Sequence, residues 1–272
     1  GIRRTFELAL DHLSELSAHR LEESDLRKRT FVFAPHQDDE TLGCGGIIAR
    51  MSDLGTEVHV VFLTDGSGSH RDRISGVELA GLRRAEATEA ARALGLPAER
   101  VHFLDAKDGS LGTDRVRVQR AVGELLVRHR PEQVFAPYFR EPPTDHAVAF
   151  DLVRSALTDW PTRLPLYGYP VWFWDRWPFV DRSASSPGEL KAELLAAVEG
   201  ALGLLFELRH RVDIGPALER KRLALGAHRT QVTRFDGSSS WSILSDVADG
   251  AWLDRMLASR EIFHRTWVGK GA

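Results

Sequence analysis

FVFAPHQDDETLGCGG, residues 31–46, is the stretch that decides the fold of this chain. Its apolar residues 31–34 favour a β-strand, and Pro35 ends that strand because proline has no amide hydrogen for the ladder. An imidazole and three carboxylates follow, and then glycines open a segment with apolar residues at helical spacing. A strand, a polar turn and a helix form a βα unit. Because sites in α/β sheets lie at the carboxyl ends of the strands, this polar turn is the first candidate site.

Further apolar runs repeat the unit along the chain. Strands are predicted over 57–64, 101–104 and 132–137, and helices over 77–95 and about 114–129. The strand at 57–64 is almost continuously apolar, which is typical of a strand buried on both faces of a parallel sheet. We therefore expect an α/β fold, a Rossmann-like and mostly parallel sheet with helices on both faces, in a single domain.

The two ends of the chain are less regular. Residues 1–29 are predicted to form an N-terminal helical arm ahead of a catalytic-type domain over 30–272. An aromatic segment at 166–174 favours a strand followed by a loop, with most of its rings packed in the core. The later predictions are listed in chain order: a helix at 189–202, a strand at 206–214, and helices at 217–228 and 251–264.

Composition excludes several classes of protein. With 272 residues, 43% apolar and 28% charged, the chain has the composition of an ordinary globular protein. A net charge of −3 gives no reason to expect nucleic acid or an anionic membrane as partner. The single cysteine, Cys44, rules out an internal disulfide framework and favours a reducing compartment. No signal peptide or membrane span is predicted, so we expect a cytoplasmic protein; a homo-oligomer is left open.

Residue types alone leave two interpretations of the acidic turn. Histidine nitrogen and carboxylate oxygen are both good zinc ligands, and three clustered carboxylates repel one another unless a cation neutralises them. The same acids also suit the N-terminus of the following helix, where they would act as caps. Both a metal site and a helix cap remain open at this point.

Two motifs carry a resemblance that favours the metal. The run HQDDE at 36–40, followed by TLGCGG, resembles the His-Pro-Asp-Asp-Glu signature of the zinc-dependent N-acetylglucosaminyl deacetylases, the LmbE-like and PIG-L family, with Gln37 in place of the proline. The stretch 136–146 ends in Asp145-His146 and resembles the second motif of that family, His-Pro-Asp-His. The resemblance covers about residues 30–235.

The resemblance implies a site and an activity. It implies one Zn²⁺ per chain held by His36, Asp39 and His146, although other divalent metals suit such ligands too. It assigns the general base to Asp38, and Asp145 becomes a candidate partner that orients an imidazole. The expected reaction is hydrolysis of the N-acetyl (N-acyl) group of an N-acetylglucosamine-type sugar or glycoconjugate.

One position departs from the family. The first histidine of the second motif falls on Pro143, which can neither stabilise an oxyanion nor protonate an amine. Candidate catalytic substitutes are His70, in the loop after the second strand, and His228, in a stretch that resembles the C-terminal pattern of the family. The departure leaves a second interpretation open, in which the chain is a weakly active or non-catalytic sugar-binding relative.

Other charged residues are candidates for binding the sugar. They are Arg83, Arg84, Asp108 and Asp65, of which Asp108 is the best candidate for a direct hydroxyl contact. A nucleotide-binding oxidoreductase is the remaining alternative. It is disfavoured because residues 43–46 do not fit the dinucleotide fingerprint and the acidic turn would repel a pyrophosphate.

Overall fold

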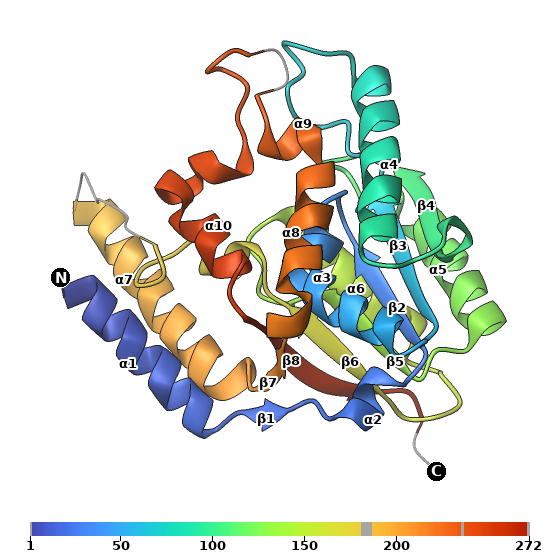
Figure 1. Cartoon of the computed structure of the whole chain (residues 1–272), viewed down its shortest axis with the longest axis horizontal. Helices are drawn as coiled ribbons and strands as arrows, with labels where there is room; N and C mark the ends of the chain where they lie inside the picture. The colour runs from blue at the N-terminus through green and yellow to red at the C-terminus, as the bar shows by residue number, and fades with distance from the viewer. Residues whose placement is uncertain (1, 181–186, 235–236, 271–272) are drawn as a thin grey trace.

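Eight strands form one sheet in the computed structural model, which describes residues 2–180, 187–234 and 237–270 (Figure 1). Their order across the sheet is β1-β7-β8-β6-β5-β2-β3-β4. The strands are β1 (His19–Arg20), β2 (Thr30–Ala34), β3 (Val58–Thr64), β4 (Val101–Ala106), β5 (Gln133–Pro137), β6 (Leu164–Tyr169), β7 (His210–Asp213) and β8 (Arg260–Val268). Strands β6, β5, β2, β3 and β4 are parallel, and β8 runs antiparallel to β6 and β7.

Helices cover both faces of the sheet (Figure 1). The α-helices are α1 (Ile2–Leu16), α2 (Glu23–Leu26), α3 (Asp39–Asp53), α4 (Gly76–Ala93), α5 (Arg115–His129), α6 (Thr144–Ala156), α7 (Pro187–Leu202), α8 (Leu218–Ala227), α9 (Arg229–Val232) and α10 (Ala251–Met256). Alternate residues of β2 point to opposite faces. Val32 packs in the core beneath α3, α4 and α8, and Phe31 and Phe33 pack in the core beneath α5 and α6. The predicted fold class is confirmed.

The strand order reverses at β2. The chain moves from β2 to β3 and β4 on one side, and it returns to place β5 and β6 on the other side. A crevice forms at the carboxyl ends of the strands where the order reverses, which here is between β2 and β5. The two candidate metal motifs follow these two strands.

The end of the chain differs from its prediction. The helix predicted over 251–264 is wrong beyond Met256, because β8 begins at Arg260 and fills the gap between β6 and β7. Exposure alternates along much of β8, a period of two that suits a strand and not a helix. Glu261 in β8 accepts hydrogen bonds from the backbone N–H groups of Gly46 (2.7 Å) and Ile47 (2.9 Å) in α3 and from Lys221 Nζ (2.8 Å).

The first residues of the chain also contribute to the sheet. The helical arm predicted over 1–29 holds α1 and α2, and between these helices β1 pairs in parallel with β7. The segment is anchored to the rest of the fold, since Arg211 in β7 donates to Glu15 and Ser14 of α1. The division into an arm and a domain stays a prediction. No helix within residues 2–180, 187–234 and 237–270 is long and apolar enough to cross a bilayer.

Candidate metal and active site

Three predicted metal ligands meet at the crevice between β2 and β5. His36 follows β2, Asp39 is the first residue of α3, and His146 lies in the first turn of α6, the helix that follows β5. Asp39 Oδ2 lies 3.3 Å from His36 Nδ1 and 3.3 Å from His146 Nε2. One donor atom from each residue lies within 4.8 Å of the other two. The structure thus brings together the set that the two motifs predicted.

The turn that carries His36 is tied to the neighbouring strand. Thr64 at the end of β3 donates from its backbone N–H (3.0 Å) and its Oγ1 (2.7 Å) to the carbonyl of Pro35. Gln37 Nε2 donates to the Thr64 carbonyl (2.8 Å). Asp38 then has a φ of 153°, which is unusual for a residue with a side chain. These contacts fix the direction in which residues 36–39 leave the strand.

A glycine lets the following helix approach the sheet. A Cβ atom on Gly43 would lie 2.2 Å from Tyr169 Cδ2, so any side chain at this position would push α3 away from β6. The Tyr169 hydroxyl in turn donates to the Phe33 carbonyl (2.8 Å), which holds the ring beneath the site.

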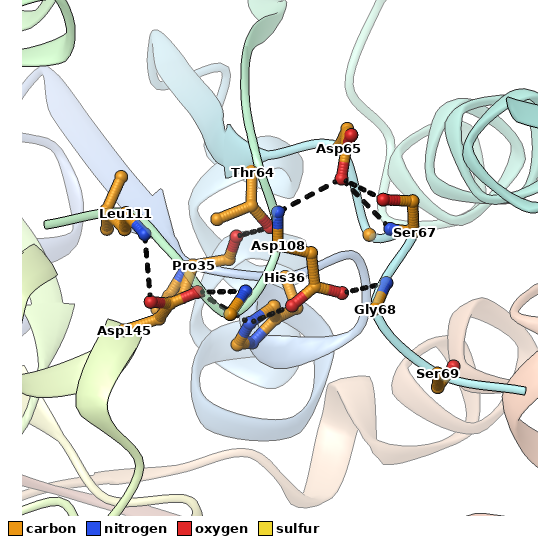
Figure 2. Close-up of polar contacts among 12 residues, drawn as sticks. Pro35, His36, Thr64, Asp65, Ser67, Gly68, Ser69, Asp108, Leu111 and Asp145 are labelled. Atoms are coloured by element: carbon orange, nitrogen blue, oxygen red, sulfur yellow. Dashed lines mark hydrogen bonds and ion pairs between the residues drawn. The ribbon is translucent and has the colours of Figure 1, made fainter. Parts of the chain in front are cut away.

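Carboxylates surround the imidazole of His36 (Figure 2). His36 Nε2 lies 3.2 Å from Asp108 Oδ1 and 3.5 Å from Asp145 Oδ2. Backbone N–H groups hold both acids in place: Gly68 donates to Asp108 (2.8 Å), and Leu111 donates to Asp145 (3.1 Å). Burial opposes protonation of His36, yet Asp108, Asp145 and Asp39 raise its pKa well above the usual value. Asp145 therefore lies beside the imidazole of His36.

The partner of His146 is Glu141, a residue that the sequence motifs did not indicate. Glu141 Oε2 lies 3.3 Å from His146 Nδ1, and both side chains are buried. Glu141 also accepts hydrogen bonds from the backbone N–H groups of residues 171 (3.1 Å), 172 (2.7 Å) and 173 (2.9 Å). Burial opposes protonation of His146, but Asp39 and Glu141 raise its pKa to about 9.

The chemistry of this group fits a divalent cation. Neither ring nitrogen of the buried His146 makes a hydrogen bond within the described residues, although each lies 3.3 Å from a carboxylate oxygen. Two imidazole nitrogens and one carboxylate oxygen form a donor set that zinc accepts. Asp108 and Asp145 add negative charge that a dication would neutralise.

Asp38 lies beside this group on the wall of a cavity. It accepts a hydrogen bond from Gln231 Nε2, and burial together with the charge of Asp39 raises its pKa to about 7. Gln231 belongs to α9, next to the only residue of that stretch predicted for the site, His228. The signal for Gln231 was the family-like pattern itself, which continues through position 231.

The cavity has a volume of about 480 Å³. His36, Asp38 and Asp39 contribute its polar wall, together with Arg83 and Asp108. The cavity also has an apolar wall, formed by Leu42, Pro143, Trp172, Ile243, Leu244 and Val247. Volume and lining suit a small polar ligand that carries an apolar part.

The two histidines considered as substitutes for the missing family histidine have different environments. His70 borders the cavity, where its ring stacks on Trp241 at 4.1 Å between centroids and its Nε2 lies 3.0 Å from the Ser242 carbonyl. His228 is fully buried, does not line the cavity, and pairs with Glu40 through a 3.1 Å contact. The structure brings His70 to the cavity and leaves His228 outside it.

The four predicted sugar-binding residues also divide. Arg83 and Asp108 line the cavity, and Arg83 holds the loop after β3 by donating to the Gly66 carbonyl (2.9 Å) and Ser69 Oγ (2.8 Å). Arg84 instead pairs with Asp105 (2.6 Å), and with Asp65 it borders a separate hollow. Asp65 accepts from Ser67 and from the backbone N–H of Asp108, so it supports the loop geometry (Figure 2).

Comparison with known proteins adds independent information. Residues 31–157 match the sequence model of the PIG-L family, described as GlcNAc-PI de-N-acetylase. A diacetylchitobiose deacetylase of Thermococcus kodakarensis is 35% identical over 111 residues, which is 40% of this chain and 40% of that protein. A 1D-myo-inositol 2-acetamido-2-deoxy-alpha-D-glucopyranoside deacetylase of Rhodococcus opacus is 27% identical over 266 aligned positions, 81% of this chain and 87% of that protein.

A solved structure shares the fold. The N,N'-diacetylchitobiose deacetylase from Pyrococcus horikoshii aligns with a TM-score of 0.63 at 23% identity, over 98% of this chain and 93% of that chain. The likeness extends over nearly the whole of both chains, so the arrangement of strands and helices described above is shared.

Proposed function

We propose that this chain, which carries a domain of the PIG-L (LmbE-like) family, is a metal-dependent hydrolase that removes the N-acetyl group from an N-acetylglucosamine-type sugar or glycoconjugate. The observation that carries the proposal is the convergence of His36, Asp39 and His146 at the wall of a cavity that His36 and Asp39 line together with Asp38. The names of the relatives support it, because both are deacetylases. The same names disfavour the non-catalytic alternative and the nucleotide-binding oxidoreductase.

The proposed metal is one Zn²⁺ held by His36, Asp39 and His146. When bound, zinc supplies Lewis-acid activation of a water molecule and of an amide carbonyl. Glu141 is the proposed positioning residue for His146, because a carboxylate on the second ring nitrogen fixes the orientation of a metal-binding imidazole. The donor set also suits other divalent ions.

Asp38 is the proposed general base and acid. Gln231 holds one of its carboxylate oxygens, which leaves the other free to take a proton from the water that attacks the acetyl carbonyl. The same carboxyl group then returns that proton to the departing nitrogen, so that acetate and a free amine result. With proline at 143, no imidazole at that position shares this work.

The substrate contacts are proposed from the lining of the cavity. Asp108 can accept hydrogen bonds from sugar hydroxyls. Trp172 and Leu244 offer an apolar surface to the group attached to the sugar. Neither Arg84 nor Asp65 reaches this cavity, so they have no part in the proposed contacts. A cytoplasmic location remains an expectation from the composition. Whether the chain forms a homo-oligomer is left open.

The test combines bound metal with acetate release. The purified chain is loaded with zinc and assayed on N-acetylglucosamine, diacetylchitobiose and N-acetylglucosaminyl-inositol, beside the variants His146→Ala and Asp38→Asn. We expect His146→Ala to bind one zinc fewer than the wild type and to release no acetate. Asp38→Asn should keep that zinc while its turnover falls by roughly 10²- to 10⁴-fold.

Three outcomes would each contradict a part of the proposal. Equal metal content in the wild type and His146→Ala would remove the metal site. Unchanged turnover in Asp38→Asn would remove the general base, and no acetate from a fully loaded wild type on any of the three sugars would overturn the activity itself.

A further inference from the structure

Three histidines lie close together at the amino-terminal ends of the parallel strands (the amino edge). The proposed active site lies at the carboxyl-terminal ends of the strands (the carboxyl edge). His59 is the second residue of β3, His102 is the second residue of β4, and His129 is the last residue of α5. One ring nitrogen from each lies within 4.8 Å of the other two. At 3.3 Å per residue along β3, His59 is roughly 20 Å from Asp65 at the carboxyl edge, so the two groups are separate.

The spacing of these rings is close to that of metal ligands. His59 Nδ1 lies 3.0 Å from His102 Nε2, and the ring centroids of His59 and His129 are 4.3 Å apart. Two nitrogens bound to one tetrahedral zinc are about 3.3 Å apart, as follows from zinc–nitrogen distances of about 2.0 Å. Small rotations of the side chains would therefore bring all three nitrogens to one ion.

A carboxylate stands beside the cluster in a favourable place. Glu57 Oε1 lies 3.0 Å from His59 Nε2, the ring nitrogen that faces away from His102. A carboxylate on the second nitrogen of a metal-binding imidazole fixes its orientation and raises its basicity. The same oxygen lies 3.9 Å from His129 Nδ1. Phe31 stacks on His59 at 4.7 Å between centroids and supports the ring from the core side.

The environment favours neutral imidazoles that an ion can reach. Burial lowers the pKa of His59, and burial together with His59, His129 and Arg128 lowers the pKa of His102 to about 4. Neutral imidazole is the form that binds a metal. His102 and His129 are half-buried, and the Glu57 side chain is 40% exposed, so solvent reaches the cluster.

We propose that His59, His102 and His129 form a second zinc site, with Glu57 orienting His59 or completing the ligand set. The site lies where β3, β4 and α5 meet, on the right-hand side of Figure 1. A bound ion would link these three elements, so its role is structural. The inference is independent of the proposed deacetylase activity, because it uses no residue of that site.

The test uses a chain whose first metal site is disabled. In His36→Ala/His146→Ala, equilibrium dialysis should find about one Zn²⁺ per chain, and added Co²⁺ should give the strong visible absorption of a tetrahedral nitrogen–oxygen site. Zinc should also raise the Tm of this variant. Adding His102→Gln or His129→Gln should abolish the uptake, the cobalt spectrum and the Tm shift. Adding His12→Gln, at an exposed histidine, should abolish none of them.

The inference is overturned if His36→Ala/His146→Ala takes up no zinc, or if uptake survives in both His102→Gln and His129→Gln. Circular dichroism of the metal-free proteins checks that each variant is folded. Because His102→Gln and His129→Gln are tested separately, one still tests the site if the other does not fold. If no zinc binds at this second site but the wild type still releases acetate, this inference fails and the proposed deacetylase activity stands.

Discussion

Histidines cluster at both ends of the parallel strands, the carboxyl edge and the amino edge, in opposite electrostatic surroundings. At the carboxyl edge, Asp39, Asp108 and Asp145 raise the pKa of His36. At the amino edge, burial together with His59, His129 and Arg128 lowers the pKa of His102. A histidine side chain therefore favours its charged form at the carboxyl edge and its neutral form at the amino edge. The carboxyl edge needs a cation or protons to balance its acids. At the amino edge, an imidazole is already neutral and can bind a metal ion without first losing a proton.

The largest effect is expected when the carboxyl edge loses one of its acids. In Glu141→Gln, the imidazole of His146 loses its negative partner, and we expect the affinity of this edge for zinc to fall by about 10- to 100-fold. Competition with a chromophoric chelator measures it. The amide also meets three backbone N–H donors with only one acceptor oxygen, so a loss of stability of about 1–3 kcal/mol is expected.

A second buried glutamate provides the matched control for that variant. Glu86 is buried and accepts hydrogen bonds from the backbone N–H (3.0 Å) and hydroxyl (2.7 Å) of Thr230, and among the described residues it forms no hydrogen bond or ion pair with His36 or His146. Glu86→Gln should lose stability without losing zinc affinity. If the two variants bind zinc equally well, the role given to Glu141 is wrong.

An intermediate effect is expected when the carboxyl edge gains an imidazole. Pro143 lines the cavity at the N-cap position of α6 with φ −66° and ψ 136°, a conformation that histidine adopts without strain. Pro143→His should raise turnover on the order of ten-fold by adding a hydrogen-bond donor beside the acetyl group. The change is measured as kcat relative to Pro143→Ala, which alters the backbone equally. A kcat no higher than that of the alanine variant would contradict this prediction.

The smallest effect concerns a histidine that belongs to neither edge cluster. His210 in β7 is buried, makes no hydrogen bond through its ring to a described residue, and has a pKa of about 4 because of burial and then of Arg265 and His19. The unfolded chain binds a proton near pH 6.5, so the neutral ring stabilises the fold above that pH. This contribution is lost as the pH falls toward 4.

Replacing His210 should therefore flatten the acid limb of the stability curve. Urea unfolding of His210→Phe at pH 7 and pH 4.5 should show a decrease smaller than that of the wild type by about 1–2 kcal/mol. The exposed His12→Gln variant should lose as much stability between the two pH values as the wild type does. An unchanged difference in His210→Phe would show that His210 is not buried as a neutral ring.

The parallel half of the fold was predictable because its strands are short apolar runs, each followed by a polar turn. Residues 31–34 and 58–63 show this clearly, and the structure places β2 and β3 there. The antiparallel part was not, since β8 mixes charges with aromatic and β-branched residues. Its sequence allows an amphipathic helix as well as a strand. The free edges of β6 and β7 decide between the two, and those edges exist only in the folded chain.

The candidate site shows the same boundary between local and tertiary information. His36, Asp39 and His146 were predicted because two local motifs contain them. Glu141 was not, because its importance depends on backbone N–H groups 30 or more residues away in sequence. The amino-edge histidines are likewise isolated in sequence, and only the register that pairs Val61 with His102 brings them together.

The position of Glu261 has a consequence for the order in which the molecule is made. This residue caps N–H groups of α3 that precede it by 215 and 214 positions, and its strand fills the gap between β6 and β7. A ribosome that adds about 5–20 residues per second takes roughly 11 to 43 s to cover that distance. Throughout this time the helix that begins at Asp39 lacks its carboxylate partner, and from the synthesis of Tyr169 until that of β8 one edge of β6 is unpaired. The nascent chain thus carries its candidate ligands long before the sheet that supports them is closed.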